Sequence, residues 1–412
     1  MAVGVKKTVL VATLLVWSAC NLGGSPVDTV VSSPAVTTPR VATTPRATAT
    51  PSTTTTTATE PPPPSTTTTT TTLVPTSTLT LELIGQVWGD ISPKSVVATG
   101  TGKFFAQNMM YRHTVTVYDE AGELLETIDD SVDLAAFGFE VTGESYRGSP
   151  VEAAMTSDGA FAYVSNYEMY GSGYGNPGGD GCGTSTWDDS YVYRIPTDTL
   201  EIDQVIAVGP VPKFLAVTPD DSLLLVSNWC GHDLSVVDLA SGLEVKRIPV
   251  GRHPRGIAIT HDGTVAYVAV MGSRHIARVD LDTFEVSYLE EVGSNPRHLV
   301  INPSDTYLYA TLNGEGKVAQ IDLATGEVLT KIRTGSAPRS MAISDDGLSL
   351  YVVNYNSGTM SKVDALTMEV LQTESVPEHP IGITFDPLSR QVWVSSYVGA
   401  ITIFQETELS DQ

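Results

Sequence analysis

The chain carries few positive charges. Its 412 residues include 23 Lys and Arg against 47 Asp and Glu, which gives a formal net charge of −24. A nucleic-acid-binding domain needs a basic face, so this balance argues against general binding to DNA or RNA. It favours solubility outside the cell, because like charges limit association. The length is sufficient for one large all-β domain with additional segments.

Catalytic and metal-binding motifs are also missing. The sequence contains no Walker loop, no G-x-S-x-G turn and no paired Cys and His nucleophile. The glycine-rich loop Tyr167–Ser190 carries Asp180, Asp188 and Asp189, whose carboxylates could bind Ca²⁺, but EF-hand spacing is absent. We therefore expect no resident metal or cofactor. No H-E-x-x-H motif is formed by the seven histidines, which are His113, His232, His253, His261, His275, His298 and His379.

No apolar run is long enough to cross a bilayer, which takes ~20 residues. The run from Thr8 to Trp17 follows Lys6-Lys7 and precedes Ser18-Ala19-Cys20. A basic start, a short apolar core and small residues before the cleavage point are typical of a secretory signal. Cysteine directly after Ser-Ala resembles a bacterial lipoprotein signal, although Trp17 departs from the usual leucine. The resemblance implies a signal peptide over residues 1–20 and a lipid on Cys20 that anchors the protein at the outer face of the cell membrane. An ordinary cleaved signal, which would leave the protein secreted, stays open.

Aromatic residues are missing between Trp17 and Trp88. The stretch 21–79 consists mainly of Thr, Pro, Ser, Ala and Val, with runs such as Pro61–Pro64 and Thr66–Thr72. This composition buries too little apolar surface to offset the entropy of ordering, so we expect a disordered linker. Proline keeps such a chain extended, and Thr/Pro composition suits an O-glycosylated stalk. The linker either lifts a domain off the surface or is a passive spacer.

Beyond residue 80 the chain repeats one pattern. Each copy contains four short β-branched runs separated by Gly, Asp or Asn turns, which predicts a four-stranded antiparallel meander. The two-fold alternation of these runs excludes a helical repeat. Successive opening prolines differ by 42 residues (254 − 212 = 42), a period that indicates the blade of a β-propeller. The prolines of the regular copies are Pro212, Pro254, Pro296, Pro338 and Pro380.

Two longer copies precede the regular ones and are opened by Pro93 and Pro150. The second is lengthened by the loop Tyr167–Ser190. The seventh copy ends after its third run, Ala400–Phe404, whereas Leu81–Val87 lies before the first copy, where an outer strand belongs. We therefore predict a seven-bladed β-propeller over residues 80–412, closed by Leu81–Val87 as the fourth strand of the last blade.

Several stretches of the repeat resemble the YVTN family of β-propeller proteins. They are Pro254–Ala269, Leu350–Gly358 and Leu234–Gly242. The resemblance covers about residues 80–408 and implies a secreted or surface propeller of a bacterium or archaeon. It implies no single activity, because the fold serves binders, surface-layer components and enzymes. Propeller lactonases and lyases share the architecture, but the sequence carries none of their catalytic signatures.

Equivalent positions of the seven copies predict a ring of charge around the channel. The residue after the opening proline begins the innermost strand, and in five copies it is basic: Lys94, Lys213, Arg255, Arg297 and Arg339. Residue 17 past the proline should open on the same face, and four copies place an aromatic residue there: Tyr167, Trp229, Tyr355 and Tyr397. Amides that precede some of these aromatic residues should lie on that face too: Asn166, Asn228 and Asn354.

Two interpretations of these rings stay open. In the first, the cations line a site for an anionic ligand, because arginine pairs with carboxylate or phosphate and aromatic rings stack on sugars. His298 follows Arg297 and would lie near the same mouth. In the second, the repeat only copies basic side chains that reach solvent or pair with nearby acids, while the aromatic residues cover strand ends.

Three classes of function remain. We favour a cell-surface or secreted propeller that binds or scaffolds and contacts an anionic glycan, peptide or cell-wall polymer. The second class is a hydrolase or lyase of the propeller lactonase or lyase type, which requires a metal or an acid–base pair in the channel, with His298, Glu152 and another carboxylate converging. The third is a structural surface-layer component, which would lack a deep polar pocket.

The two cysteines beyond Cys20 are predicted to form a disulfide. Export places them where disulfides persist, and with Cys20 assigned to lipid an even number remains. Cys182 and Cys230 lie in equivalent loops of neighbouring copies, which should lie side by side on one face. A bridge would pin the long loop to the next blade. It closes 230 − 182 = 48 residues, which the chain-entropy model values at roughly 3–4 kcal/mol.

Overall fold

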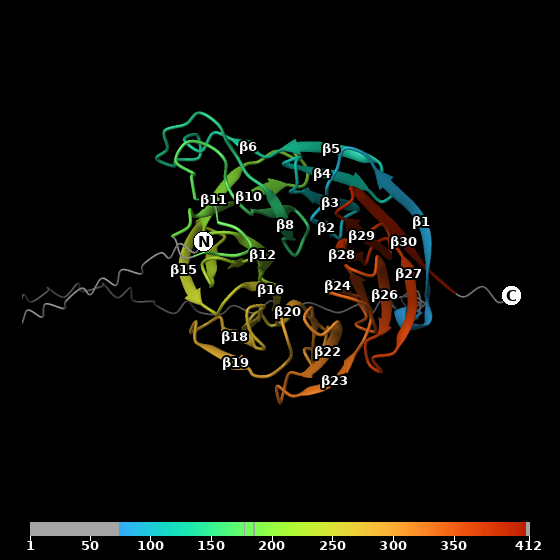
Figure 1. The fold of residues 1–412 in the computed structure, drawn as a ribbon. Helices are drawn as coiled ribbons and strands as arrows, with labels where there is room; N and C mark the ends of the chain where they lie inside the picture. Colours follow the sequence, from blue (N-terminus) through green and yellow to red (C-terminus); the bar gives the residue numbers. More distant parts are fainter. Residues whose placement is uncertain (1–73, 177, 184–185, 409–412) are drawn as a thin grey trace, which may run out of the picture. The chain divides into compact units, whose positions relative to one another are not determined.

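Seven four-stranded antiparallel sheets are arranged in a ring around a central axis (Figure 1). The computed structural model describes residues 74–176, 178–183 and 186–408. Consecutive strands pair within each sheet, and each innermost strand contacts the innermost strands of the two neighbouring sheets, which closes the ring. The predicted seven-bladed, all-β propeller is confirmed. The predicted signal peptide, Cys20 and most of the predicted linker lie outside the described residues.

The blades are numbered from the innermost strand that comes first in the chain. Blade 1 contains β2 (Ser95–Ala98), β3 (Lys103–Asn108), β4 (Thr114–Asp119) and β5 (Leu124–Asp129). Blade 2 contains β8 (Pro150–Met155), β9 (Phe161–Asn166), β10 (Ser190–Pro196) and β11 (Gln204–Val208). Blade 3 contains β12 (Pro212–Val217), β13 (Leu223–Asn228), β14 (Asp233–Asp238) and β15 (Leu243–Pro249). Between blades 1 and 2 the short strands β6 (Ser131–Val132) and β7 (Tyr146–Arg147) form a separate pair.

The remaining blades follow the same order. Blade 4 contains β16 (Pro254–Ile259), β17 (Val265–Val270), β18 (Ile276–Asp280) and β19 (Val286–Leu289). Blade 5 contains β20 (Pro296–Ile301), β21 (Tyr307–Leu312), β22 (Lys317–Asp322) and β23 (Val328–Ile332). Blade 6 contains β24 (Pro338–Ile343), β25 (Ser349–Asn354), β26 (Thr359–Asp364) and β27 (Val370–Ser375). Blade 7 contains β28 (Pro380–Asp386), β29 (Gln391–Ser396), β30 (Ala400–Thr407) and, as its outer strand, β1 (Thr80–Trp88).

The two ends of the described chain close the ring. β1 pairs antiparallel with β30 along its length, with one bulge between Leu83 and Gly85. Figure 1 shows this pairing as a blue strand beside the red ones. The prediction that Leu81–Val87 is the outer strand of the last blade is therefore confirmed, and the strand extends one residue further at each end. Closure pairs an edge that β30 would otherwise expose.

The segment before β1 is also held by the propeller. The linker is predicted to run to residue 79, but the short 3-10 helix η1 (Thr76–Thr78) packs on blade 6. Thr76 donates from its backbone N–H and its hydroxyl to the carboxylate of Asp346, at 2.7 Å each. Nζ of Lys362 donates to the carbonyl oxygens of Thr76 and Leu79 at 2.7 and 2.9 Å. The propeller thus holds residues 76–79, which the sequence analysis assigned to the linker, because side chains of blade 6 satisfy the backbone of this segment.

A buried ion pair joins this segment to blades 6 and 7. Nζ of Lys362, on β26, lies 2.9 Å from Oε1 of Glu406, on β30, and neither side chain is exposed. The other carboxylate oxygen of Glu406 accepts from Nη2 of Arg390 at 2.7 Å. The hydroxyl of Tyr351 donates to Glu406 as well. Both charges are thus paired and hydrogen-bonded, which a buried ion pair requires.

The core lies between neighbouring blades. Leu225 and Val236 of blade 3, for example, pack in one cluster with Ala266 and Val268 of blade 4. A single blade cannot bury both of its faces, so each blade depends on the next for its stability. The interface between the first and last blades is packed in the same way. Phe104 of blade 1 stacks on Trp393 of blade 7 with ring centroids 3.9 Å apart.

We predict that Glu406→Ala destabilises the protein by about 3–5 kcal/mol, because it leaves Lys362 charged and unpaired in the interior. Equilibrium denaturation in urea measures the change. Glu369→Gln is the control, because Glu369 is exposed on blade 6, and it should change the free energy of unfolding by less than about 0.5 kcal/mol. An equally small effect of Glu406→Ala would contradict the role given to this ion pair.

Candidate functional site

A repeated backbone hydrogen bond brings the two predicted rings together. The carbonyl of the residue before each regular opening proline accepts from the N–H of residue 17 past that proline, as Val211 does from Trp229 at 2.9 Å and His379 from Tyr397 at 3.1 Å. The loop between the second and third strands therefore lies beside the start of the innermost strand. The accepting residues have φ between 53° and 58°, a region that non-glycine residues seldom adopt; they are Val211, His253, Asn295, Ala337 and His379.

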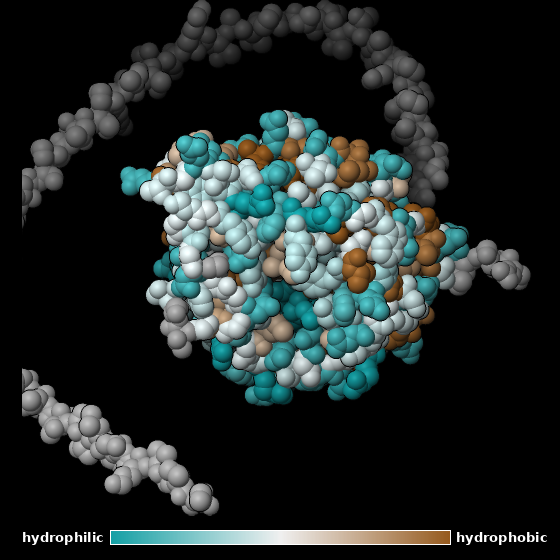
Figure 2. All heavy atoms as spheres, turned by 45° about the horizontal axis from the view of Figure 1, so that its top comes forward, coloured by the Kyte–Doolittle hydropathy of each residue, from teal (hydrophilic) through white to brown (hydrophobic). Residues whose placement is uncertain are grey.

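The five predicted cations line one cavity at the mouth of the channel. Its volume is about 420 Å³. A hydrophilic hollow is visible near the middle of the face shown in Figure 2. The cavity is lined by Lys94, Lys213, Arg255, Arg297 and Arg339, by the aromatic residues Tyr167, Trp229 and Tyr397, and by Met109, Met110, Met271 and Asp180. We call it the mouth cavity.

Most of this positive charge is buried without a partner. Among the described residues, Lys213 is the one cation of the five in a salt bridge, with Oδ1 of Asp180 at 2.6 Å. Arg297 is 4% exposed, and its Nε has no hydrogen-bond partner in the described structure. The same holds for Nε of Arg339. Buried charges are normally paired, so the mouth cavity holds uncompensated positive charge. Four of these side chains neither reach solvent freely nor pair with a described acid, contrary to the second interpretation of the ring.

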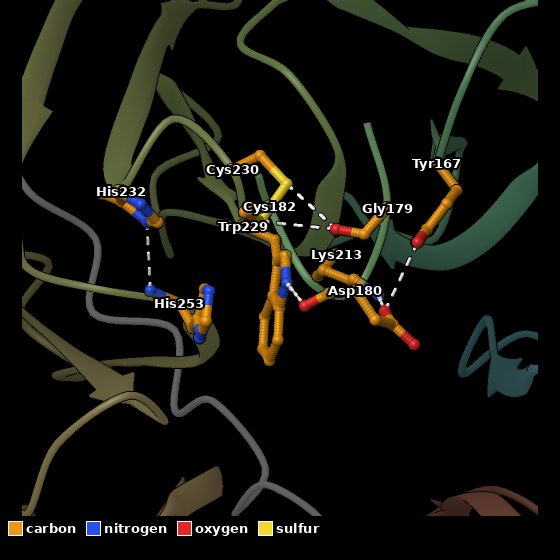
Figure 3. The surroundings of a disulfide bond; sticks show 9 residues. All are labelled: Tyr167, Gly179, Asp180, Cys182, Lys213, Trp229, Cys230, His232 and His253. Carbon is orange, nitrogen blue, oxygen red and sulfur yellow. Dashed lines mark hydrogen bonds and ion pairs between the residues drawn. A yellow bond between two sulfur atoms is a disulfide. The ribbon is translucent and has the colours of Figure 1, made fainter. Parts of the chain in front are cut away.

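Aromatic faces position Lys213 from two sides. Its Nζ lies 4.2 Å from the ring centroid of Tyr167 and 5.0 Å from that of Trp229. Trp229 in turn stacks on His253 with centroids 4.4 Å apart, so its ring lies between a cation and an imidazole (Figure 3). Cation–π contacts of this kind are favourable, and more so where water is excluded.

The other aromatic residues make the same kind of contact. Cζ of Arg339 lies 3.9 Å from the ring centroid of Tyr355, which is beside the cavity rather than in its lining. Nζ of Lys94 lies 5.5 Å from the centroid of Tyr397. Tyr355 and Tyr397 meet edge to face at 6.1 Å. The rings therefore contact cations, whereas the two interpretations of the sequence placed them against a ligand or over strand ends.

Burial, followed by the crowding of like charges, lowers the pKa values of the two lysines in the mouth cavity. Burial, followed by repulsion from Arg255, lowers the pKa of Lys213 to about 7, against the opposing effect of Asp180. Burial and then the neighbouring cations lower the pKa of Lys94 well below its ordinary value. Burial opposes ionisation of Asp180, but Lys213 outweighs it and holds the pKa of this carboxyl at about 2. Arginine stays charged in proteins, so the repulsion among Arg255, Arg297 and Arg339 persists.

His298 lies in a different part of the channel. It lines a second chamber of about 220 Å³ with Glu152 and Phe214, and this chamber shares no lining residue with the mouth cavity. Its ring meets Phe214 edge to face at 5.0 Å, and burial followed by Arg255 and Arg297 lowers its pKa to about 3. The structure therefore corrects the expected position beside the mouth, because successive side chains of a strand point to opposite sides.

Glu152 is the one carboxyl group in the described lining of this chamber. Burial raises its pKa to about 7, although Ser95, Lys94 and Arg255 favour the ionised form. Within the part of the chain that the structure describes, no group of three His, Cys, Asp or Glu is placed to hold a metal ion. Glu152 and His298 thus share a chamber, but no third such ligand joins them there.

The side-chain amides that were predicted to lie on the face of the mouth cavity do not lie there. Asn166, Asn228 and Asn354 are fully buried. Nδ2 of Asn228 donates to Ser235 Oγ at 2.8 Å, and Nδ2 of Asn354 donates to Ser361 Oγ at 3.1 Å. The amides of Asn228 and Asn354 thus connect strands within their own blades, whereas the amide of Asn166 is buried without a partner among the described residues. The strand carries all three into the sheet one residue before the loop opens.

The predicted disulfide between Cys182 and Cys230 is present, with Cα atoms 5.2 Å apart. It fastens the long loop of blade 2 to blade 3 beside the mouth cavity (Figure 3). Gly178 passes so close to Val211 that an added Cβ would lie 2.6 Å from its side chain, at a φ of +82°. Close approach and positive φ both require glycine there.

Asp180 lines the mouth cavity, but comparing equivalent positions of the repeats could not predict that it would. It belongs to an insertion, so no other blade has an equivalent position. The available signal was its place two residues before Cys182, since a bridge at Cys182 also limits where Asp180 can lie. The methionines were a weaker signal: Met110 and Met271 occupy position 17 of their blades, where others carry aromatic rings.

Comparisons with known proteins identify the fold. Residues 262–395 match the family described as the cytochrome D1 heme domain, which covers a minority of the 412 residues. The chain is similar in structure to Kuenenia stuttgartiensis hydrazine synthase, with 18% identity and a TM-score of 0.62 over 79% of this chain and 98% of that one. Likeness at this identity shows the β-propeller alone. No curated protein matches the chain.

The mouth cavity does not suit a haem. Haem iron takes an axial His, Cys thiolate, Met or Tyr, but Cys182 and Cys230 are bonded to each other and His298 lies in the other chamber. Met109, Met110 and Met271 line the mouth cavity, but they lie among five cations that crowd it, and Met271 contacts Nη1 of Arg297 at 3.7 Å. A volume of about 420 Å³ is also near the lower end for ligand sites. The lining fits a smaller anionic group better.

We predict that Arg297→Met stabilises the ligand-free protein by about 1–2 kcal/mol, because it removes a buried, unpaired and repelled charge. Thermal or urea denaturation measures the change. Arg333→Met alters the net charge equally at an exposed position and should have an effect below about 0.5 kcal/mol. Destabilisation by Arg297→Met beyond that of the control would show that the arginine is already satisfied in the native state.

Proposed function

We propose that the protein is an exported β-propeller that binds an anionic ligand in the mouth cavity. One observation carries the proposal: three buried cations, Lys94, Arg255 and Arg297, and the half-buried Arg339 converge on this cavity without a carboxylate partner among the described residues. An entering anion would supply those partners. Arginine pairs with carboxylate or phosphate through two parallel hydrogen bonds, and low-dielectric walls strengthen the attraction.

The size of the mouth cavity limits the ligand. Small-molecule sites usually measure about 300–1,000 Å³, and the mouth cavity has about 420 Å³. It therefore suits a small anion or the end group of a glycan, peptide or cell-wall polymer, rather than the middle of a folded partner. A purely structural surface-layer role is less well supported, since it would leave the buried charge unexplained.

Export and anchoring complete the proposal. A disulfide agrees with an oxidising compartment outside the cytosol. No helix in the described ranges is long and apolar enough to cross a bilayer. The proposed contact with a membrane is the lipid on Cys20, with the Thr/Pro-rich linker between that lipid and the propeller. Mass spectrometry of the mature chain distinguishes a lipid on Cys20 from a plain cleaved terminus.

A hydrolase or lyase acting in the channel is the second candidate. It is favoured by Glu152, whose raised pKa of about 7 suits proton transfer near neutral pH, in one chamber with His298. Incubation of each bound anion with the full chain, followed by mass spectrometry, tests for turnover. Conversion that Glu152→Gln abolishes would make the protein an enzyme, whereas intact ligands would favour simple binding.

We predict that the full chain binds anions in calorimetric titrations with acetate, succinate, citrate, phosphate and D-glucuronate. Arg297→Met should lower the affinity for the tightest-binding of these anions by roughly tenfold or more, because it removes a buried charge-assisted contact. Arg333→Met should leave the affinity unchanged. Failure of every probe to bind the wild-type chain would contradict the proposed function.

We predict that anion affinity falls by roughly tenfold or more between about pH 6 and about pH 8. Lys213 and Glu152 both have a pKa of about 7 in the ligand-free protein. As the pH rises through that value, Lys213 in the mouth cavity loses its positive charge. Glu152, in the second chamber but within electrostatic reach of Lys94 and Arg255, gains a negative charge, so the potential at the mouth cavity becomes less positive. Titration with a probe whose own charge is constant over this range measures the effect. Tighter binding at the higher pH would contradict the assignment.

A further inference from the structure

The inserted loop places one carboxylate in an otherwise positive cavity. Asp180 accepts from Nζ of Lys213 at 2.6 Å and from the hydroxyl of Tyr167 at 3.3 Å, both through Oδ1 (Figure 3). It is the one carboxylate in the lining of the mouth cavity as the structure describes it. The repeat accounts for the cations, but it does not account for Asp180, which belongs to the insertion that distinguishes blade 2.

Several contacts fix the position of Asp180. Its carbonyl oxygen accepts from Nε1 of Trp229 at 3.0 Å, and the disulfide at Cys182 holds the chain two residues later. Its side chain is nevertheless 81% exposed, whereas that of its partner Lys213 is 6% exposed. The carboxylate thus covers a buried cation while presenting its outer side to whatever enters the cavity.

Recognition of a ligand here depends on polar contacts. Tyr167 and Trp229 already have Lys213 over their rings, Tyr397 has Lys94, and Trp229 also stacks on His253. Little aromatic face is left for stacking on a ligand. The arginines and Lys94 offer donors for anionic groups, and Asp180 offers an acceptor for hydroxyl groups.

We infer that Asp180 is a specificity-determining residue of the mouth cavity and that it selects hydroxylated anions, of the sugar-acid class, over anions without hydroxyl groups. The inference rests on the proposed anion site. The anionic group of such a ligand pairs with the unpartnered cations, and its hydroxyls donate to the ionised carboxylate of Asp180. An anion without hydroxyls gains no such bond and meets only repulsion from Asp180.

A matched pair of ligands tests the inference. D-glucuronate and cyclohexanecarboxylate both carry one carboxylate on a six-membered ring, but only the first carries hydroxyl groups. Calorimetry on the full chain should show that D-glucuronate binds roughly tenfold or more tightly than cyclohexanecarboxylate. Asp180→Asn should reduce this ratio to about twofold, because it removes both the charge-assisted acceptor and the repulsion. Asp198→Asn makes the same charge change at an exposed site and should leave the ratio unchanged.

The outcomes separate this inference from the function on which it rests. If Asp180→Asn raises the affinity for both ligands equally, Asp180 is only a competing anion. The inference is then overturned, while the proposed anion site stands. Equal binding of the two ligands by the wild-type chain overturns it as well. If neither ligand nor any other anion binds, the proposed function fails first. A glucuronate-terminated oligosaccharide is titrated in parallel and shows whether the ligand is the end of a glycan or a free sugar acid. Binding of either compound supports the inference if Asp180→Asn weakens that binding.

Discussion

Pairing of β1 with β30 is the interaction on which the rest of the structure depends. It joins the two ends of the described chain in one sheet and closes the ring of blades. Only in a closed ring do the innermost strands converge on one axis. That convergence brings Lys94 of blade 1 and Arg339 of blade 6 into the same cavity, although they are far apart in the sequence. The ion pair of Lys362 and Glu406 stabilises this junction from inside.

Closure has an electrostatic cost, because it brings like charges together on side chains that are mostly buried. The apolar contacts between blades offset this cost, and the aromatic rings of the mouth cavity reduce it locally through cation–π contacts. Under the proposed function, stability and anion binding are opposed at Arg297, as stability and function often are at binding sites. The charge that is expected to destabilise the ligand-free fold is the charge proposed to attract an anion.

The insertion in blade 2 breaks the symmetry of this arrangement. Seven similar blades can place similar groups around an axis, but a ligand with distinct ends requires unlike groups in one site. The loop supplies one through Asp180, and the disulfide and the indole of Trp229 keep it in place. Under the proposed function, the repeat supplies the positive charge that attracts an anion, and the insertion supplies the carboxylate that discriminates between anions.

The sequence by itself determined the period, the number of blades, the closing strand and the five cations, because strand alternation, turn residues and equivalent offsets are local properties that repeat every 42 residues. It also indicated the disulfide, since Cys182 and Cys230 occupy equivalent loops of adjacent blades. Tertiary structure alone decided that the aromatic faces hold cations, that His298 lies in the second chamber and that Asp180 enters the mouth cavity. These outcomes depend on side-chain directions and on packing between different blades, and an insertion has no counterpart in the repeat from which its place could be read.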